Sequence, residues 1–525
     1  MRCKRTLSFL LCFLLVIVVC IGRVGYVGLS NDFYVSSSYN SYTLLIDKRY
    51  PTVYDVRSAL LTNASDRYVA VIKPDEKCLS ELTRLFDAEA IADITRELKS
   101  GYPIVREIDA EKKDVRLEYI KILKCKVHYD TRQLCAHLIS GVTGGVESHF
   151  SELFSEVSEM SVNYAVDAKG RLLAGDTGTV HNESYASHRG IGLTVDREIQ
   201  QIAENAMDTS RIEKGAVVIT DVDSGAVRAL CSRPNIDLTN VADAQNDFLN
   251  RALQAYSVGS VFKIVVACCA LENGMDNVRY TCHGKIRVAD TDYACQNTKA
   301  HGAETLKTAL ANSCNCYFVN LALKLGEEKL WQTAYSFGFG GETYLGGDWK
   351  VSNGVIDDKS LLASDGRLAL LGFGQGRLSA TPLMFASVVA AVANGGLYYE
   401  PYIVDAYVDD DGTRRRTPAS AEPQGKRILS QTTAKTMQSY LEYVVTHGTG
   451  RAAQSSDGLS AGKTSTAQSG QYENGREILH TWFAGYYPSN DPKYAIVIMD
   501  EDGTSGGGDC GPVFRQIVDK LAADQ

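Results

Sequence analysis

The chain has 525 residues, 45% of them hydrophobic and 22% charged, which excludes a protein that is disordered over most of its length. It contains 54 Lys and Arg against 63 Asp and Glu, a net charge of −9. The sequence has no basic run, so it argues against a nucleic-acid-binding protein. At about 150 residues per domain, the length predicts two to four domains.

The N-terminus carries an uncharged apolar segment, residues 6–22, close to the lower limit of about 17–25 residues for a membrane-spanning helix. Three basic residues precede it, which favours a cytoplasmic N-terminus. We therefore expect residues 1–30 to form a cytoplasmic tail and a single-pass anchor in the cell membrane, with the remaining chain extracytoplasmic. A cleaved signal peptide is the alternative, but no Ala-x-Ala site follows the segment.

Fourteen cysteines are too sparse in a chain of this length for a disulfide scaffold. Cys282 and Cys295 bracket an alternating segment that suggests a hairpin, so a disulfide between them and two separate thiols both remain open. Cys314 and Cys316 have no second Cys or His pair at ligand spacing, and the nine histidines form no metal pattern. Since no Gly-rich phosphate loop occurs either, we expect neither a metal nor a cofactor.

Two folded regions are expected after the anchor. Residues 31–189 have mixed polar composition and short strand-like and helical runs, which predict an α+β domain without catalytic residues. From residue 190 the pattern changes to a helix, a strand pair, a mainly helical stretch over 260–396, three strands and a terminal helix. This order predicts an α/β domain over 190–525, in which helices flank an antiparallel sheet and the first and last strands share that sheet.

The first chemical motif is Ser260-Val-Phe-Lys263, directly after Gly259. Residues at i and i+3 share a helix face, so the Lys263 amine can reach the Ser260 hydroxyl. A helix N-terminus favours a developing alkoxide, and apolar neighbours lower the pKa of the lysine toward that of a usable base. One or two Ser-x-x-Lys sequences are expected by chance in a chain of this length. The motif therefore indicates an active site only if other catalytic motifs accompany it.

Two further motifs follow in order. Ser313-Cys-Asn315 offers a hydroxyl that can relay a proton and a carboxamide that can hold a substrate amide. Lys463-Thr-Ser-Thr466, on a predicted strand, offers a cation and hydroxyls for a carboxylate. Each motif alone is compatible with a capped helix, a loop or a solvated strand end. All three in this order are typical of penicillin-binding proteins and serine β-lactamases.

Flanking segments narrow the resemblance to one class. They are Tyr256-Ser-Val-Gly-Ser-Val-Phe-Lys263, Gly372-Phe-Gly-Gln-Gly376 and Trp482-Phe-Ala-Gly-Tyr486. With them, the chain resembles a class B penicillin-binding protein, a monofunctional peptidoglycan D,D-transpeptidase. The resemblance implies the penicillin-binding transpeptidase fold, an N-terminal anchor and a pedestal domain over 31–189. The pedestal match is weaker and rests on Tyr50-Pro-Thr-Val-Tyr-Asp55 and Gly145-Val-Glu147.

The resemblance also implies roles for individual residues. Ser260 would be acylated by a peptidoglycan stem peptide or by a β-lactam antibiotic, with Lys263 as base and Ser313 as proton relay. The substrate-binding residues would be Asn315, Lys463, Thr464, Ser465 and Thr466. A membrane glycosyltransferase of the shape, division and sporulation family is the implied partner. No cofactor is implied.

One departure and two alternatives accompany this interpretation. The family usually has Gly where this chain has Ser465, for which we expect a modest loss or an altered β-lactam preference. The chain could instead be a weakened structural activator of a glycosyltransferase. A serine β-lactamase is less favoured, because Glu342-Thr-Tyr-Leu-Gly346 lacks the Asn of the class A hydrolytic stretch. His447-Gly-Thr-Gly450 is expected to be a loop near the site.

Overall fold

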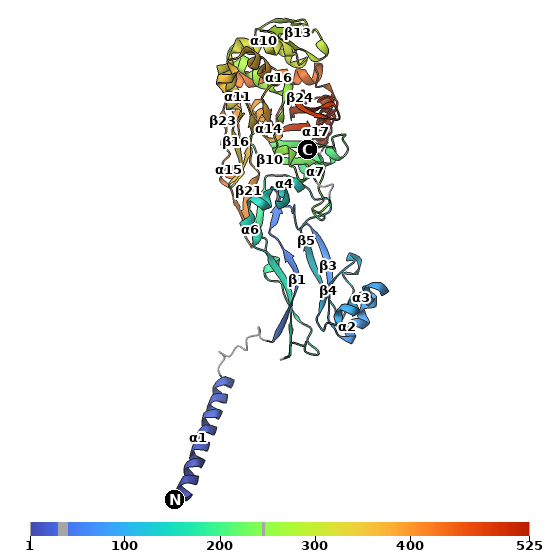
Figure 1. The fold of residues 1–525 in the computed structure, drawn as a ribbon, viewed down its shortest axis with the longest axis vertical. Helices are drawn as coiled ribbons and strands as arrows, with labels where there is room; N and C mark the ends of the chain where they lie inside the picture. The colour runs from blue at the N-terminus through green and yellow to red at the C-terminus, as the bar shows by residue number, and fades with distance from the viewer. Residues whose placement is uncertain (1, 30–39, 168, 244–246, 524–525) are drawn as a thin grey trace. The chain divides into compact units, whose positions relative to one another are not determined.

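The computed structural model describes residues 2–29, 40–167, 169–243 and 247–523 (Figure 1). It divides into two compact units. The first consists of Met1–Lys48, Arg67–Cys125 and Glu159–Ala186, and the second of Arg49–Asp66, Lys126–Ser158 and Ser187–Gln525. Segments 49–66 and 126–158, which we expected in the N-terminal domain, thus belong to the second unit.

The first unit begins with helix α1 (Arg2–Leu29), whose side chains from Leu10 to Val24 are mostly exposed. Among the described residues, no helix combines the length and the apolar character needed to span a membrane. The anchor expected over residues 1–30 therefore stays a prediction.

Two three-stranded sheets and two helices form the rest of the first unit. The sheets have the orders β1-β6-β7 and β4-β3-β5. The elements are β1 (Ser41–Arg49), β3 (Ser65–Ile72), β4 (Ile104–Ile108), β5 (Lys121–Val127), β6 (Ser158–Ala165), β7 (Thr179–His181), α2 (Glu76–Glu81) and α3 (Ala88–Leu98). Strand β3 separates two cores: Val69 and Val71 pack with β1 and β6, whereas Ala70 and Ile72 pack with the helices, as the period of a strand requires.

The second unit is built on a five-stranded antiparallel sheet of order β10-β9-β26-β25-β24. The strands are β9 (Gly215–Asp221), β10 (Val227–Arg233), β24 (Ala461–Glu473), β25 (Arg476–Tyr487) and β26 (Tyr494–Asp500). Strand β9 pairs with β26, so the first and last parts of the domain share one sheet, as predicted.

Helices cover both faces of this sheet. Val217 and Ile219 of β9 pack with α7 (Arg197–Asp208) and α17 (Cys510–Ala523). Ala216 and Val218, on the opposite face, belong to the large core that contains α8 (Lys263–Glu272) and α14 (Pro382–Ala393). Helix α7 begins at Arg197, because the Asp196 side chain accepts hydrogen bonds from two amides of its first turn.

The second unit contains further helices and short strands. The helices are α4 (Ala136–Ile139), α5 (Val146–His149), α6 (Ser151–Ser155), α9 (Leu306–Ala311), α10 (Asn315–Leu325), α11 (Glu327–Ser336), α12 (Lys359–Leu362), α13 (Asp365–Gly372), α15 (Pro418–Ala421) and α16 (Gln431–His447). The two-stranded sheets nearest the chemical motifs are β12 (Tyr280–Cys282) with β15 (Gly302–Glu304) and β13 (Lys285–Val288) with β14 (Thr291–Ala294).

A small sheet pairs β20 (Leu397–Tyr398) with β23 (Lys426–Arg427), and a four-stranded sheet and two other small sheets complete the described part of the unit. The larger sheet has the order β2-β8-β21-β22, from β2 (Thr52–Tyr54), β8 (Gly190–Leu193), β21 (Val404–Val408) and β22 (Arg414–Arg416). Another pairs β16 (Glu342–Gly346) with β17 (Trp349–Ser352). The third joins β11 (Tyr256–Ser257), β19 (Ser379–Ala380) and β18 (Gly354–Val355).

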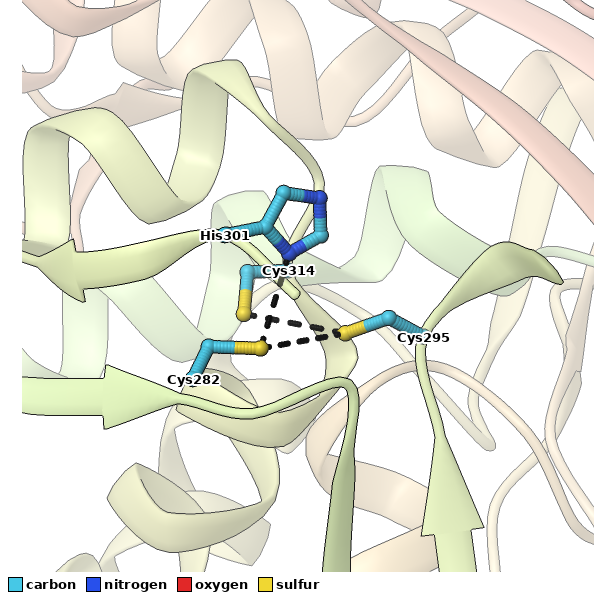
Figure 2. A group of neighbouring side chains, drawn as sticks. All are labelled: Cys282, Cys295, His301 and Cys314. Atoms are coloured by element: carbon cyan, nitrogen blue, oxygen red, sulfur yellow. Dashed lines mark hydrogen bonds between the residues drawn. The ribbon is translucent and has the colours of Figure 1, made fainter. Parts of the chain in front are cut away.

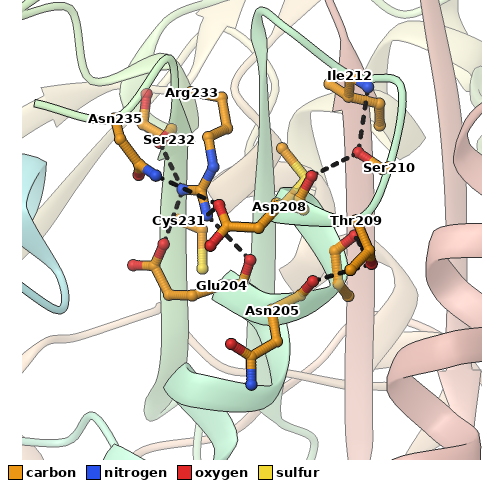
Figure 3. A network of polar contacts seen from close by, with 12 residues as sticks. Glu204, Asn205, Asp208, Thr209, Ser210, Ile212, Cys231, Ser232, Arg233 and Asn235 are labelled. Atoms are coloured by element: carbon orange, nitrogen blue, oxygen red, sulfur yellow. Dashed lines mark hydrogen bonds and ion pairs between the residues drawn. The ribbon is translucent and has the colours of Figure 1, made fainter. Parts of the chain in front are cut away.

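A buried ion-pair network ties α7 to the end of β10 (Figure 3). The Arg233 guanidinium is 5% exposed and lies 2.7 Å from a carboxylate oxygen of Glu204 and 2.7 Å from one of Asp208. It also donates to the Glu204 backbone carbonyl. Since a charge this far from water requires partners, the network fixes the helix on the strand.

Candidate active site

Ser260 lies in a tight turn that precedes a buried helix. Residues Gly259–Phe262 form one turn of 3₁₀-helix, and α8 follows from Lys263. Gly259 has φ +55°, and a Cβ there would lie 2.5 Å from the Ser465 Oγ and 2.8 Å from the Ala467 Cβ. Only glycine fits this position, because the conformation is left-handed and β24 passes against it.

The Lys263 amine joins two of the predicted motifs. It lies 3.0 Å from the Ser260 Oγ and 3.2 Å from the Ser313 Oγ. It also donates to the Ser313 carbonyl oxygen at 2.8 Å and to the Asn315 Oδ1 at 2.6 Å. One nitrogen thus contacts both hydroxyls that the sequence proposed for nucleophile and relay.

Burial changes the acidity of this lysine. Lys263 is completely buried, and loss of hydration lowers its pKa from 10.5 to about 7, although nearby cysteines act in the opposite direction. A substantial fraction is therefore an unprotonated amine at neutral pH. Such an amine can accept the proton of a neighbouring hydroxyl.

Ser313 and Asn315 are held at the start of α10. Ser313 has φ +54°, a conformation uncommon for serine, and Cys314 caps the helix. The Asn315 Nδ2 donates to the Ala294 carbonyl at 2.9 Å, while its Oδ1 faces Lys263. Both ends of this carboxamide are fixed, which sets its orientation.

The third motif lies on β24, the edge strand of the sheet. Ser465 pairs with Trp482 of β25, and the Trp482 indole donates to the Ser257 carbonyl at 2.9 Å. The Ser465 hydroxyl donates to the Val258 carbonyl at 2.7 Å. The strand is therefore attached to the segment just before Ser260, and all three motifs meet.

The two buried lysines influence each other. Lys463 is completely buried, and its amine donates to the Thr464 carbonyl at 2.7 Å. Burial, followed by the positive charge of Lys263, lowers the pKa of Lys463 well below its usual value. An approaching carboxylate would favour the charged form of Lys463.

Two supporting features were not singled out as part of the site from the sequence. The Thr449 Oγ1 lies 2.7 Å from the Thr464 Oγ1, and the Thr449 amide donates to the Ala311 carbonyl, so the expected loop joins the third motif to the end of α9, two residues before Ser313. A Cβ on Gly374 would lie 1.8 Å from the Gly259 carbonyl oxygen. The Gly-Gln-Gly segment thus packs directly against the nucleophile turn.

The structure agrees with one of the two alternatives left open for Cys282 and Cys295, and it adds a group of side chains that was not expected. Cys282 and Cys295 are free thiols with sulfurs 3.7 Å apart. Cys314 and His301 lie beside them, and the four ligand atoms are all within 4.8 Å of one another (Figure 2). Our expectation that no metal pattern exists was based on Cys-x-Cys spacing. It missed this group because the four residues come from separate turns of the chain.

Comparison with known proteins identifies the family. Residues 215–519 match the penicillin-binding protein transpeptidase domain. The chain belongs to this family. The resemblance to class B penicillin-binding proteins drawn from the motifs is thereby confirmed.

Similar proteins match across nearly the whole chain. Stage V sporulation protein D of Bacillus subtilis is 28% identical over 92% of this chain and 76% of that protein. The Escherichia coli peptidoglycan D,D-transpeptidase FtsI is 26% identical over 97% of this chain and 89% of that protein. Penicillin-binding protein 3 of Mycobacterium tuberculosis, solved with aztreonam, has a TM-score of 0.64 at 23% identity over 92% and 97% of the two chains. The similarity to this solved structure shows that the two chains share a fold.

Proposed function

We propose that the protein is a peptidoglycan D,D-transpeptidase that works through a Ser260 acyl-enzyme and is a target of β-lactams. The observation that carries the proposal is the Lys263 amine, which lies 3.0 Å from the Ser260 Oγ and 3.2 Å from the Ser313 Oγ. A buried amine with a pKa of about 7 between two hydroxyls is suited to move a proton in both half-reactions.

The reaction has two balanced steps. Ser260 Oγ attacks the carbonyl of the penultimate D-Ala of a stem peptide while Lys263 accepts its proton. As the peptide bond breaks, Lys263 returns this proton through the Ser313 hydroxyl to the nitrogen of the departing terminal D-Ala, which leaves an ester on Ser260 and a neutral Lys263 amine. An amine of a neighbouring stem attacks this ester, forms the crosslink and returns the proton to the Ser260 oxygen.

The remaining motif residues bind and orient the donor. Asn315 would hold the peptide amide, while Lys463, Thr464 and Thr466 would contact the terminal carboxylate. Backbone amides of Ser260 and Thr466 would stabilise the oxyanion, a contribution of about 3–4 kcal/mol for one donor. A β-lactam would use the same contacts and remain attached to Ser260.

We also propose where the protein acts. The apolar segment 6–22 with basic residues before it supports a single-pass anchor, with the catalytic domain outside the cell membrane. A pedestal built from the N-terminal region and a membrane glycosyltransferase of the shape, division and sporulation family as partner complete the proposal. Their support is the resemblance to the class. Protease accessibility of the catalytic domain in intact spheroplasts tests the orientation.

Covalent labelling of the purified full chain with a fluorescent penicillin tests the chemistry. We expect one label per chain, lost in Ser260→Ala and retained in Ser257→Ala, a neighbouring serine that lies outside the Ser-x-x-Lys motif itself. Release of D-Ala from a pentapeptide substrate, with a crosslinked product, then separates a transpeptidase from a hydrolase. Absence of label at saturating penicillin would overturn the enzymatic proposal and favour a structural activator.

A further inference from the structure

Three cysteines and one histidine form a compact group beside the active site (Figure 2). Cys282 ends β12, Cys295 follows β14, His301 precedes β15 and Cys314 caps α10. The three cysteines are at most 3% exposed, and His301 is half-buried. Together they bring four soft or borderline donor atoms to one point.

Three of the six distances between these atoms match those of a tetrahedral zinc site, and all six are within 4.8 Å. With Zn–S near 2.3 Å and Zn–N near 2.0–2.1 Å, tetrahedral angles require S···S of about 3.8 Å and S···N of about 3.6 Å. The Cys282–Cys295 and Cys295–Cys314 sulfurs are 3.7 and 3.8 Å apart, and the Cys282 sulfur lies 3.6 Å from the His301 Nδ1. A disulfide would need about 2.05 Å.

The surroundings of the sulfurs also suit bound metal. The Gly284 amide donates to the Cys282 sulfur at 3.4 Å, and the Tyr317 amide donates to the Cys314 sulfur at 3.4 Å. Amide hydrogen bonds of this kind orient and stabilise ligating thiolates. The Cys316 sulfur lies 3.5 Å from that of Cys295 and 3.9 Å from the Tyr293 carbonyl oxygen, and Cys316 is outside the group of four.

We propose that Cys282, Cys295, His301 and Cys314 bind one Zn²⁺ as a closed structural site. Binding would release three thiol protons and leave the imidazole neutral, so the filled site carries a net charge of −1. The ion would crosslink two small two-stranded sheets that have little core of their own. The proposal is independent of the assigned activity, because it concerns residues that the reaction does not use.

The site would also position the Ser-x-Asn motif. Cys314 stands between Ser313 and Asn315, and Cys295 follows Ala294, whose carbonyl accepts from the Asn315 amide at 2.9 Å. Two of the four ligands therefore neighbour the two ends of one hydrogen bond. The bound ion would hold that hydrogen bond and keep the Asn315 Oδ1 against Lys263.

Metal analysis of the full chain tests the proposal. We expect about one Zn²⁺ per chain after purification without added metal, and at least a 10- to 100-fold weaker affinity for Zn²⁺ in Cys282→Ser and His301→Ala. Cys316→Ser and Cys268→Ser are matched controls that should retain the ion. Loss of Zn²⁺ from Cys316→Ser alone, or no bound zinc in the wild type, would overturn the assignment.

Cobalt substitution of the wild-type chain guards against variants that fail to fold. Co²⁺ bound by three thiolates and one imidazole should give intense thiolate charge-transfer bands and tetrahedral ligand-field bands. Weak ligand-field bands of octahedral Co²⁺ would contradict the proposed site. A Cys282–Cys295 disulfide found by non-reducing peptide mapping would contradict it as well. Chelation of Zn²⁺ from the wild type is further expected to slow penicillin acylation by about 10- to 100-fold through misplacement of Asn315.

Discussion

The Ser465 hydroxyl donates a 2.7 Å hydrogen bond to the backbone carbonyl of Val258, two residues before the nucleophile. Ser465 is 3% exposed, so its side chain is turned into the protein. Ser465, which stands where the family usually has Gly, thus stabilises the turn that contains Ser260. This contact explains how a serine is accommodated where the family has glycine.

Replacement of this serine should therefore affect stability more than access to the site. In Ser465→Gly we expect the free energy of unfolding to fall by about 1–2 kcal/mol, from one lost hydrogen bond and the added freedom of glycine. Urea denaturation measures the loss. A large gain in penicillin acylation would instead show that the hydroxyl obstructs the ligand.

Acylation should depend on pH through Lys263. Because its pKa is lowered to about 7 and the neutral amine is the active form, the rate constant should fall about tenfold per pH unit below 7 and level off above about 8. Rates of fluorescent penicillin labelling between pH 5.5 and 9 check this.

Asp500 is the control for that profile, because burial raises its pKa to about 7 as well. The Asp500→Asn variant should keep the inflection near pH 7. An inflection that disappears in this variant would assign the profile to the carboxyl group rather than to the lysine.

Thr449 is expected to orient the hydroxyl of Thr464, since their oxygens lie 2.7 Å apart. Thr449→Val preserves the backbone hydrogen bond to Ala311 but removes this contact, so acylation should fall about tenfold, as for about 1–1.5 kcal/mol. Thr436→Val, at a half-buried position of α16, removes a hydroxyl contact with the Thr432 carbonyl and should have no such effect. Equal acylation rates in the two variants would show that Thr449 does not orient Thr464.

The Arg233 network should contribute strongly to stability. Arg233→Leu leaves the largely buried Glu204 carboxylate without its opposite charge, although Gln200 still donates to it, and this should lower the free energy of unfolding by about 3 kcal/mol. Arg515→Leu breaks an exposed pair with Asp519 on α17, and we expect a change within about 0.5 kcal/mol. Chemical denaturation of both variants provides the comparison.

The sequence predicted the second unit well because its signals are local. Short, nearly continuous apolar runs mark β9, β10 and β26, and the Ser260–Lys263 spacing places both side chains on one helical face. The Cys282–Cys314 neighbourhood could not be found this way. Its members come from separate short strands and loops, and their proximity depends on how β12, β14 and β15 fold back on α10.

The division of the chain into two units could not be predicted from local sequence patterns either. Segments 49–66 and 126–158 belong to the second unit because β2 pairs with β8 and because α4 and α5 pack into its large core. The composition of residues 31–189 does not indicate these long-range contacts. The Thr449 contact is similar, since only tertiary packing of the loop after α16 brings it to β24.

The pairing of β9 with β26 has a consequence for biosynthesis. These strands are separated by more than half of the chain, yet they are hydrogen-bonded neighbours at the centre of the sheet. During translation one edge of β9 stays unpaired until β26 has left the ribosome. Pairing between strands so distant in sequence slows folding, and the unpaired edge is prone to aggregation in the meantime. A ribosome stalled before Tyr494 would therefore hold a nascent chain that no amount of time can bring to the native topology.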